Sequence, residues 1–309
     1  MKLAIRIVLA AVALAAIAAG VIFLPGQYAL WRLVPTRADV AYGTQSPSQK
    51  LDLYRPAGVT RPVPVVVLIH GGAFMFGDKR EPMEGFVNGV HRLNAAGIAL
   101  ASIDYRMSGE ARFPAAARDA RSAVRYLRAH AAELGIDPAR IAVWGKSAGA
   151  NLALMAAVAP AGAQFDDPAI APGTSGAVSA VISMYAPTDF LMMDTQLRAG
   201  PCGASAATHD DAASPESLYI GAKITAAQDL ARAASPIHHV RAGMPPMLVE
   251  AGTMDCTVPA QQSQTFAEAM TKAGNRVMLH LLPGARHGDD AFETADHQAA
   301  VIAFLKAAW

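Results

Sequence analysis

One serine lies between two glycines in the stretch Val143-Trp144-Gly145-Lys146-Ser147-Ala148-Gly149-Ala150-Asn151. The apolar residues before it are typical of a buried strand, and the alanine-rich residues after it are typical of a helix. Small residues two before and two after a serine allow a tight strand-to-helix turn, and Gly145 and Gly149 occupy these positions. The pattern predicts a serine hydroxyl that projects above a sheet. The other interpretation, Ser147 as a helix N-cap, does not explain both glycines.

From about Asp39 onward, short apolar segments alternate with longer helix-like segments. This alternation predicts an α/β fold, with a mostly parallel central sheet of about eight strands flanked by helices. Strands are predicted near residues 50–54, 63–69, 99–103, 141–144, 178–184, 247–250 and 276–282, and helices near 115–132, 148–159, 261–273 and 291–308. Residues 188–239 are rich in Gly, Ala, Ser and Asp, so we expect them to form a small cap over the strand ends.

The composition limits the kinds of partner. Of 309 residues, 53% are hydrophobic and 17% are charged, which suits one globular domain with a large core. The formal net charge is +1 and no basic run stands out, so we expect no nucleic-acid partner. The two cysteines, Cys202 and Cys256, are too few and too far apart for a zinc cluster. We therefore expect no metal site.

The N-terminal residues resemble a targeting segment. Lys2 and Arg6 precede an uncharged run of 18 residues, Ile7 to Leu24, which would span about 27 Å as a helix. We expect residues 1–30 to be an uncleaved signal anchor, with residues 31–309 as an extracytoplasmic domain. The alternative is a cleaved signal peptide and a periplasmic or secreted domain, because small residues suited to cleavage occur at Ala13–Ala15 and Ala18–Gly20.

A serine hydroxyl needs a base to become a good nucleophile, and the base needs a carboxylate to orient it. Asp255 follows Ser147 by 108 residues, directly after one predicted strand, and His287 follows the next strand. All three residues therefore fall at the carboxyl ends of strands, where open α/β sheets bind ligands. Asp189 is the competing candidate for the acid, because it follows the strand that ends at Met184.

The tetrahedral intermediate of acyl transfer also needs N–H donors for its negative oxygen. The stretch His70-Gly71-Gly72-Ala73-Phe74 follows a buried strand directly, which is a suitable place for such donors. Two adjacent glycines in this position are also compatible with a simple tight turn.

With these motifs together, the chain resembles the α/β-hydrolase carboxylesterases of the hormone-sensitive-lipase-like and feruloyl-esterase-like groups. The resemblance covers nearly all of residues 39–309 and rests on six stretches: His70 to Phe74 with Gly77-Asp78-Lys79, Asp104-Tyr105-Arg106, Gly145 to Gly149, Ser235-Pro236 with Pro245-Pro246, Gly252 to Asp255, and Pro283 to Gly288. It implies Ser147 as the nucleophile, His287 as the base and Asp255 as the acid. The implied oxyanion hole is formed by the N–H groups of Gly72, Ala73 and Ala148, with His70, Gly71, Gly145 and Gly149 as supporting motif residues. The resemblance implies no metal and no cofactor.

Three positions depart from the family pattern or stay open. Ala73 stands where the family usually has a third glycine, and alanine adopts a positive φ less readily. For Cys256, next to the acid, we expect a buried free thiol, with a disulfide to Cys202 as the alternative. We expect Lys146 to reach solvent, since it neighbours Ser147 on an extended turn.

The sequence thus predicts a serine esterase for short-chain or carbohydrate-linked esters, with a small-molecule substrate and a membrane contact through the N-terminal segment. An amidase, formamidase or peptidase would use the same triad. A membrane-tethered binding module that had lost catalysis would show a broken triad or oxyanion loop, and both are intact here.

Overall fold

The computed structural model describes residues 33–80, 84–162, 164–203 and 208–309. The predicted N-terminal anchor, residues 1–30, lies outside the described residues. Among the residues that are described, no helix combines the length and the apolar character needed to cross a membrane.

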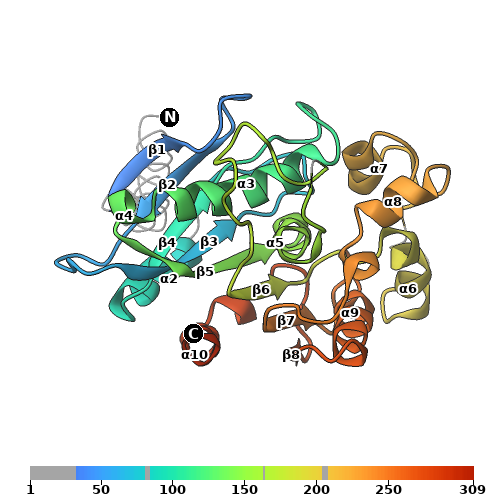
Figure 1. The fold of residues 1–309 in the computed structure, drawn as a ribbon. Coiled ribbons are helices and arrows are strands. Elements are labelled where there is room, and N and C mark those ends of the chain that lie inside the picture. Colours follow the sequence, from blue (N-terminus) through green and yellow to red (C-terminus); the bar gives the residue numbers. More distant parts are fainter. Residues whose placement is uncertain (1–32, 81–83, 163, 204–207) are drawn as a thin grey trace, which may run out of the picture.

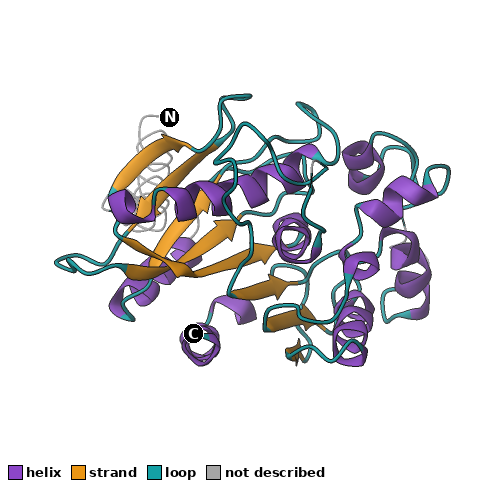
Figure 2. Ribbon diagram, viewed as in Figure 1, coloured by secondary structure: helices purple, strands orange, loops and turns teal. Residues whose placement is uncertain are grey.

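The centre of the domain is one sheet (Figures 1 and 2). Its strands, in chain order, are β1 (Arg37–Ala41), β2 (Lys50–Tyr54), β3 (Val63–Ile69), β4 (Ala99–Ile103), β5 (Ile136–Lys146), β6 (Ala180–Met184), β7 (Met247–Gly252) and β8 (Val277–Leu282). They are arranged in the order β1-β2-β4-β3-β5-β6-β7-β8. β2 pairs antiparallel with both β1 and β4, and all the other pairs are parallel. The predicted eight-stranded, mostly parallel α/β fold is confirmed.

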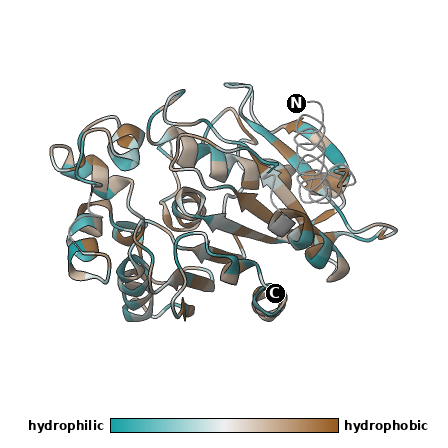
Figure 3. Ribbon diagram, turned by 180° about the vertical axis from the view of Figure 1, so that it is seen from behind, coloured by the Kyte–Doolittle hydropathy of each residue, from teal (hydrophilic) through white to brown (hydrophobic). Residues whose placement is uncertain are grey.

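The alternation of side chains along β3 explains why the sheet is covered on both faces. Val65, Val67 and Ile69 belong to one apolar cluster, whereas Val66 and Leu68 belong to another. Helices α3 (Ala115–Ala129), α5 (Ala148–Val158) and α9 (Ala260–Lys272) contribute to the first cluster, and α2 (Glu84–Ala95) and α10 (Ala295–Ala308) contribute to the second. Figure 3 shows the strands as the more hydrophobic layer, with hydrophilic residues on the outer helices.

The strand order places two loops side by side at the carboxyl edge of the sheet. β3 lies between β4 and β5 in the sheet. After β3 the chain forms β4 on one side of it, and it later returns to form β5 on the other side. Ligands of open α/β sheets bind in the crevice at such a reversal. The loop after β3 contains the His70–Phe74 stretch, and the turn after β5 contains Ser147.

The predicted cap is a group of short helices between β6 and β7. It comprises the 3-10 turns η1 (Phe190–Met192) and η3 (Pro236–His239) and the helices α6 (Met193–Ala199), α7 (Pro215–Ile220) and α8 (Gln228–Ala233). Figure 1 shows α6, α7 and α8 grouped on one side of the molecule, away from β1 and β2. Tyr219 of α7 stacks on Phe74 with ring centroids 4.0 Å apart, so the cap packs on the loop that follows β3.

Several boundaries differ from the predicted ones. β5 begins at Ile136, five residues before the predicted strand, because Ile136 pairs with Val63 ahead of a register shift. The predicted helix over 115–132 is divided into α3 and a short α4 (Ala131–Leu134), which ends at Gly135 in the left-handed conformation. α2 and β1 were not predicted. α2 has a recognisable helical apolar pattern in Phe86, Val90 and Leu93, which all face the sheet.

Candidate active site

The turn between β5 and α5 holds Ser147 in an unusual backbone conformation, with φ of 52° and ψ of −122°. A positive φ is rare for a residue with a side chain, and such strained positions gather at functional sites. The neighbouring glycine explains how the turn can be this tight. A Cβ atom at Gly149 would lie 2.1 Å from the carbonyl oxygen of Ile69 and 2.3 Å from that of His70. Only glycine therefore allows the elbow to approach the end of β3.

The structure brings together the three predicted catalytic residues. His287 Nε2 lies 2.9 Å from Ser147 Oγ, and His287 Nδ1 lies 2.7 Å from Asp255 Oδ2. Because an ionised carboxylate only accepts hydrogen bonds, Nδ1 carries the hydrogen and Nε2 is free to accept the serine proton. The serine, the histidine and the acid are thus connected in the order that proton transfer requires.

The Asp255 carboxylate is buried and held on both oxygens. Its side chain is inaccessible to solvent, and Oδ1 accepts hydrogen bonds of 2.8 Å from the backbone N–H groups of Thr257 and Val258. Oδ2 accepts the hydrogen bond from His287. The acid therefore has one possible orientation, which fixes the plane of the imidazole.

Asp189, the competing acid, has a different role. Its side chain accepts a hydrogen bond from the N–H of Leu191 at the start of η1, and its Oδ1 lies 3.7 Å from His238 Nε2. The carboxylate that contacts His287 is that of Asp255.

The loop after β3 supplies unpaired N–H groups next to the elbow. Gly72 has a φ of 107° and its carbonyl accepts hydrogen bonds from the N–H groups of Met75 and Phe76, which closes a tight turn. Within the described part of the chain, the N–H groups of Gly72, Ala73 and Ala148 have no hydrogen-bond partner. The Ala148 N–H is unpaired because it lies in the first turn of α5. The three predicted oxyanion donors therefore remain available to a ligand.

Ala73 adopts the positive φ that the sequence made doubtful. Its φ is 53°, and that of Phe74 is 61°. The surrounding contacts hold this conformation: Phe74 is buried under Tyr219 of the cap, and the Tyr105 hydroxyl donates hydrogen bonds to the carbonyls of His70 and Gly71. The His70 ring stacks on Tyr105 at 4.5 Å. The supporting residues of the motif thus fix the backbone of the loop.

Arg106 and Asp119 form an ion pair below this loop. Arg106 donates from its backbone N–H and two guanidinium nitrogens to the Asp119 carboxylate, at 2.7 to 2.9 Å. The hydrogen bond to Asp119 outweighs burial and raises the pKa of the Arg106 guanidinium above its ordinary value. Asp119 also accepts from Gln49 Nε2 at 2.8 Å, so its buried charge is well compensated.

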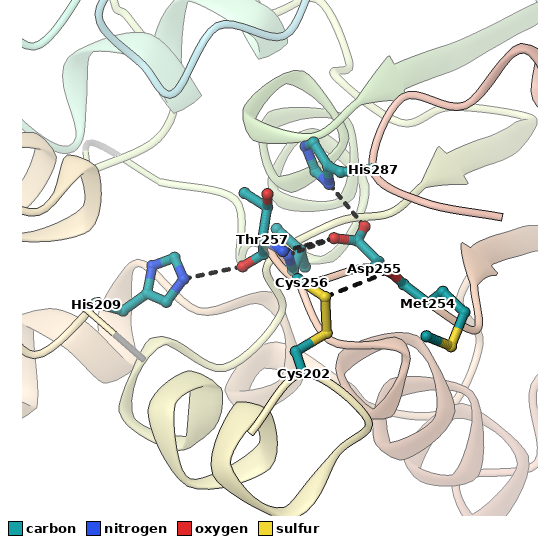
Figure 4. Close-up of a disulfide and its surroundings, with 8 residues drawn as sticks. Cys202, His209, Met254, Asp255, Cys256, Thr257 and His287 are labelled. Carbon is teal, nitrogen blue, oxygen red and sulfur yellow. Dashed lines mark hydrogen bonds and ion pairs between the residues drawn. A yellow bond between two sulfur atoms is a disulfide. The ribbon is translucent and has the colours of Figure 1, made fainter. Parts of the chain in front are cut away.

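The expected free thiol at Cys256 was wrong. Cys256 forms a disulfide with Cys202, with the two Cα atoms 5.5 Å apart, and it is exposed rather than buried. The bond ties the cap to the residue after Asp255 (Figure 4). The alternative that the sequence left open is the one that the structure contains. Whether two distant cysteines meet depends on the path of the cap, which the local sequence does not reveal.

A histidine of the cap makes a second connection to the acid loop. His209 Nε2 lies 2.9 Å from the carbonyl oxygen of Thr257 (Figure 4). Its Nδ1 lies 2.8 Å from Glu216 Oε2. Both partners offer acceptor oxygens, so the cationic ring, which carries a hydrogen on each nitrogen, satisfies both contacts. Burial disfavours this charge, but Glu216 and the Thr257 carbonyl outweigh it and raise the pKa of His209. The sequence offered no signal for this contact.

Lys146 does not extend into solvent as expected. Its Nζ lies 2.7 Å from Glu293 Oε1, and its side chain is only 14% exposed. Glu293 belongs to the 3-10 turn η4 (Asp290–Glu293), which precedes α10. The residue beside the candidate nucleophile is therefore paired with an acid that lies 147 positions further along the chain.

The chain is similar to several known esterases. The chain is 31% identical over 261 residues to esterase LipC of Mycobacterium tuberculosis, covering 84% of this chain and 61% of LipC. It thus spans about three fifths of that relative's length. A truncated carbohydrate esterase from gut microbiota superposes with a TM-score of 0.76 and 26% identity, covering 90% of this chain and 98% of that one.

Est2, an esterase of Thermogutta terrifontis, has been solved with butyrate bound and is also similar to this chain. Its TM-score is 0.69 with 29% identity, over 90% of this chain and 93% of that one. Est2 phosphonylated by sarin gives a TM-score of 0.67 with 30% identity, over 88% and 93% of the two chains. The family model BD-FAE matches residues 51–270. The resemblance to α/β-hydrolase carboxylesterases is thereby confirmed, and the chain belongs to the BD-FAE family.

Proposed function

We propose that this protein hydrolyses carboxylic esters through an acyl-serine intermediate. The observation that carries the proposal is the pair of hydrogen bonds at His287: Nε2 accepts from Ser147 Oγ at 2.9 Å, and Nδ1 donates to Asp255 Oδ2 at 2.7 Å. The esterase relatives support the same reaction type. Each residue then has one role, which follows from the atoms that it presents.

In the acylation half, Ser147 Oγ attacks the ester carbonyl carbon while His287 Nε2 takes the hydroxyl proton. Asp255 stabilises the imidazolium that forms and keeps the ring in place. The carbonyl oxygen becomes negative and receives hydrogen bonds from the N–H groups of Gly72, Ala73 and Ala148. His287 then gives the proton to the alkoxide oxygen as the C–O bond breaks, and the alcohol leaves.

In the deacylation half, a water molecule replaces the alcohol. His287 removes a proton from this water, whose oxygen attacks the acyl carbon, and the same N–H groups stabilise the second tetrahedral intermediate. Collapse of that intermediate breaks the bond to Ser147 Oγ and returns the proton to the serine. The carboxylic acid leaves and the enzyme is restored.

We infer a substrate with a short or carbohydrate-linked acyl group. The inference is supported by relatives described as a carbohydrate esterase and as a butyrate-bound esterase. Two large apolar side chains beside the site are available to an ester: Phe76 is 61% exposed after the β3 loop, and Met254 is 41% exposed next to Asp255. A panel of acyl esters of increasing length, acetylated and feruloylated sugars and an aryl formamide would identify the preferred class. Preference for the formamide would favour the amidase alternative instead.

Replacing the nucleophile tests the proposal directly. Ser147→Ala should lower kcat for a small activated ester by roughly 10⁴- to 10⁶-fold, as loss of a catalytic serine does elsewhere. Ser175→Ala is the matched control, because Ser175 is exposed and distant in the sequence from the triad. An organophosphate should label the wild-type chain once, at Ser147, and should not label Ser147→Ala. Equal turnover by the two variants, or labelling at another serine, would refute the proposed mechanism.

We further propose that the domain works outside the cytoplasm. Lys2, Arg6 and the apolar run from Ile7 to Leu24 support export with an inside N-terminus. The Cys202–Cys256 disulfide is also typical of an oxidising compartment. Protease digestion of intact spheroplasts, with a cytoplasmic marker as the control, would test this: protection of the domain would contradict an external location.

A further inference from the structure

A second group of functional side chains lies near the triad but apart from it. Glu250 on β7 is directly opposite His280 on β8 in the parallel pair, and His297 projects from α10. The Glu250 side chain is 1% exposed and that of His297 is 5% exposed, whereas His280 is 49% exposed. The proposed hydrolysis uses none of the three.

The three side chains converge on one point. Glu250 Oε1 lies 3.2 Å from His280 Nδ1, and Glu250 Oε2 lies 3.1 Å from His297 Nε2. One ligand atom from each residue lies within 4.8 Å of the others. Tetrahedral zinc sites have metal–ligand bonds of about 2.0–2.2 Å to nitrogen and oxygen, which places the ligand atoms about 3.3 Å apart. The separations of Glu250 from His280 and from His297 are close to that spacing.

Two of the converging atoms lack a hydrogen bond. Glu250 Oε2 and His297 Nε2 face each other but are not aligned for a hydrogen bond, and neither atom has another partner in the described part of the chain. A buried carboxylate oxygen and a buried imidazole nitrogen without partners are costly. A cation bound between them would satisfy both at once.

We propose that Glu250, His280 and His297 bind a divalent transition metal of the zinc type. Two imidazoles and one carboxylate form a ligand set that proteins use for zinc, and the set leaves a fourth position for water. The half-exposed His280 provides access from solvent.

The expectation of no metal from the sequence rested on the two cysteines. Glu250 and His280 lie 30 residues apart in the sequence, and His280 and His297 lie 17 residues apart. Only the pairing of β7 with β8 and the packing of α10 bring the three together.

The ion would fasten α10 to the edge of the sheet, behind the catalytic histidine. His297 contacts the Phe292 ring, Phe292 contacts Tyr185, and the Tyr185 ring lies edge-on against His287 at 4.8 Å. The Tyr185 N–H also donates to the Glu250 carbonyl at 2.7 Å. The metal therefore has a structural role, separate from the bond-breaking steps.

The test uses the 309-residue chain treated with a chelator and then titrated with Zn²⁺ or Co²⁺. We expect one equivalent of Zn²⁺ to bind and to raise Tm, and bound Co²⁺ to give the intense visible bands of a four-coordinate site. His297→Gln and His280→Gln should each weaken Zn²⁺ binding by about tenfold or more, since even indirect partners of a metal contribute about that much. His130→Gln is the control, because His130 contacts Tyr126 on the far end of α3.

These readouts, Tm and the Co²⁺ spectrum, do not depend on catalytic activity. Absence of a Zn²⁺-dependent rise in Tm and of Co²⁺ bands in the wild-type chain would overturn the proposal. Unchanged Zn²⁺ affinity in both His280→Gln and His297→Gln would overturn it as well. If His297→Gln fails to fold, His280→Gln still decides, because that side chain is half exposed on the edge strand and its loss disturbs little packing.

Discussion

Cys256, the residue after the candidate catalytic acid, is covalently bonded to Cys202 of the cap. The acid loop is therefore anchored from two directions, by the disulfide and by the N–H groups of Thr257 and Val258 that hold Asp255 Oδ1. The position of the carboxylate behind His287 depends on the position of the cap.

Removing the disulfide should destabilise the protein and weaken catalysis. The bond spans 54 residues, for which the chain-entropy relation gives up to about 4 kcal/mol in the free energy of unfolding. We expect Cys202→Ser/Cys256→Ser to unfold at lower urea concentration, and its kcat to fall about tenfold through a misplaced Asp255. Reductant should change the wild-type chain in the same direction and leave the double variant unchanged. Equal stability of oxidised and reduced wild type would contradict this.

The contribution of His209 should depend on pH. The folded state raises the pKa of His209, so the stabilisation is fully present below the ordinary pKa of about 6.5 and is lost as the pH rises through the higher folded value. The difference in unfolding free energy between wild type and His209→Gln should therefore be larger at pH 5.5 than at pH 9. The groups facing the ring are Glu216, the Thr257 carbonyl and Asp194. Urea unfolding of both proteins at the two pH values measures this difference in unfolding free energy. A difference that increased from pH 5.5 to pH 9 would contradict the prediction.

An added methyl group at Gly149 should displace the elbow. Its Cβ would meet two backbone carbonyls of β3 and the following loop, and neither oxygen can rotate away. We expect Gly149→Ala to cost about 1–3 kcal/mol in stability and to lower kcat about 100-fold, because Ser147 would shift relative to His287. Gly109→Ala is a matched control, since no heavy atom lies within 4 Å of its added Cβ. Comparable kcat values in the two variants would show that the elbow tolerates the shift.

The ion pair between Lys146 and Glu293 should act on stability and not on the pH dependence of hydrolysis. The two side chains are 14% and 21% exposed, so loss of the cation should cost about 1–2 kcal/mol, between the values for exposed and buried pairs. Chemical unfolding of Lys146→Met, with exposed Lys272→Met as the control, tests this. A shifted pH profile of kcat/KM in Lys146→Met would show that the cation acts on His287 after all.

The parts of the site that could be predicted from the sequence are those that short stretches of chain specify. The elbow needs glycines at fixed offsets from Ser147, and the oxyanion loop needs its glycines directly after a buried strand, so both were recognisable. Asp255 and His287 were placed by a single rule, that functional residues follow the carboxyl ends of strands.

The parts that could not be predicted depend on where distant segments meet. The partner of Lys146 is on η4, the partner of Cys256 is in the cap, and Glu250 reaches His297 only because α10 packs beside β7 and β8. Residue type alone did not distinguish these contacts from a solvated lysine, a free thiol and ordinary core histidines. Each needed the register of the sheet or the path of the cap.

The position of the cap in the chain also has a consequence for evolution. The chain leaves the sheet after β6 and comes back to it at β7. The two ends of the cap lie side by side, because the N–H of Ile237 donates a hydrogen bond of 3.2 Å to the carbonyl of Thr188. A segment attached in this way can be exchanged, lengthened or shortened as one unit while the strands that carry Ser147, Asp255 and His287 keep their pairing. In this chain a replacement cap would need its own cysteine in the place of Cys202, because removing the cap would also remove the disulfide to Cys256 in the acid loop.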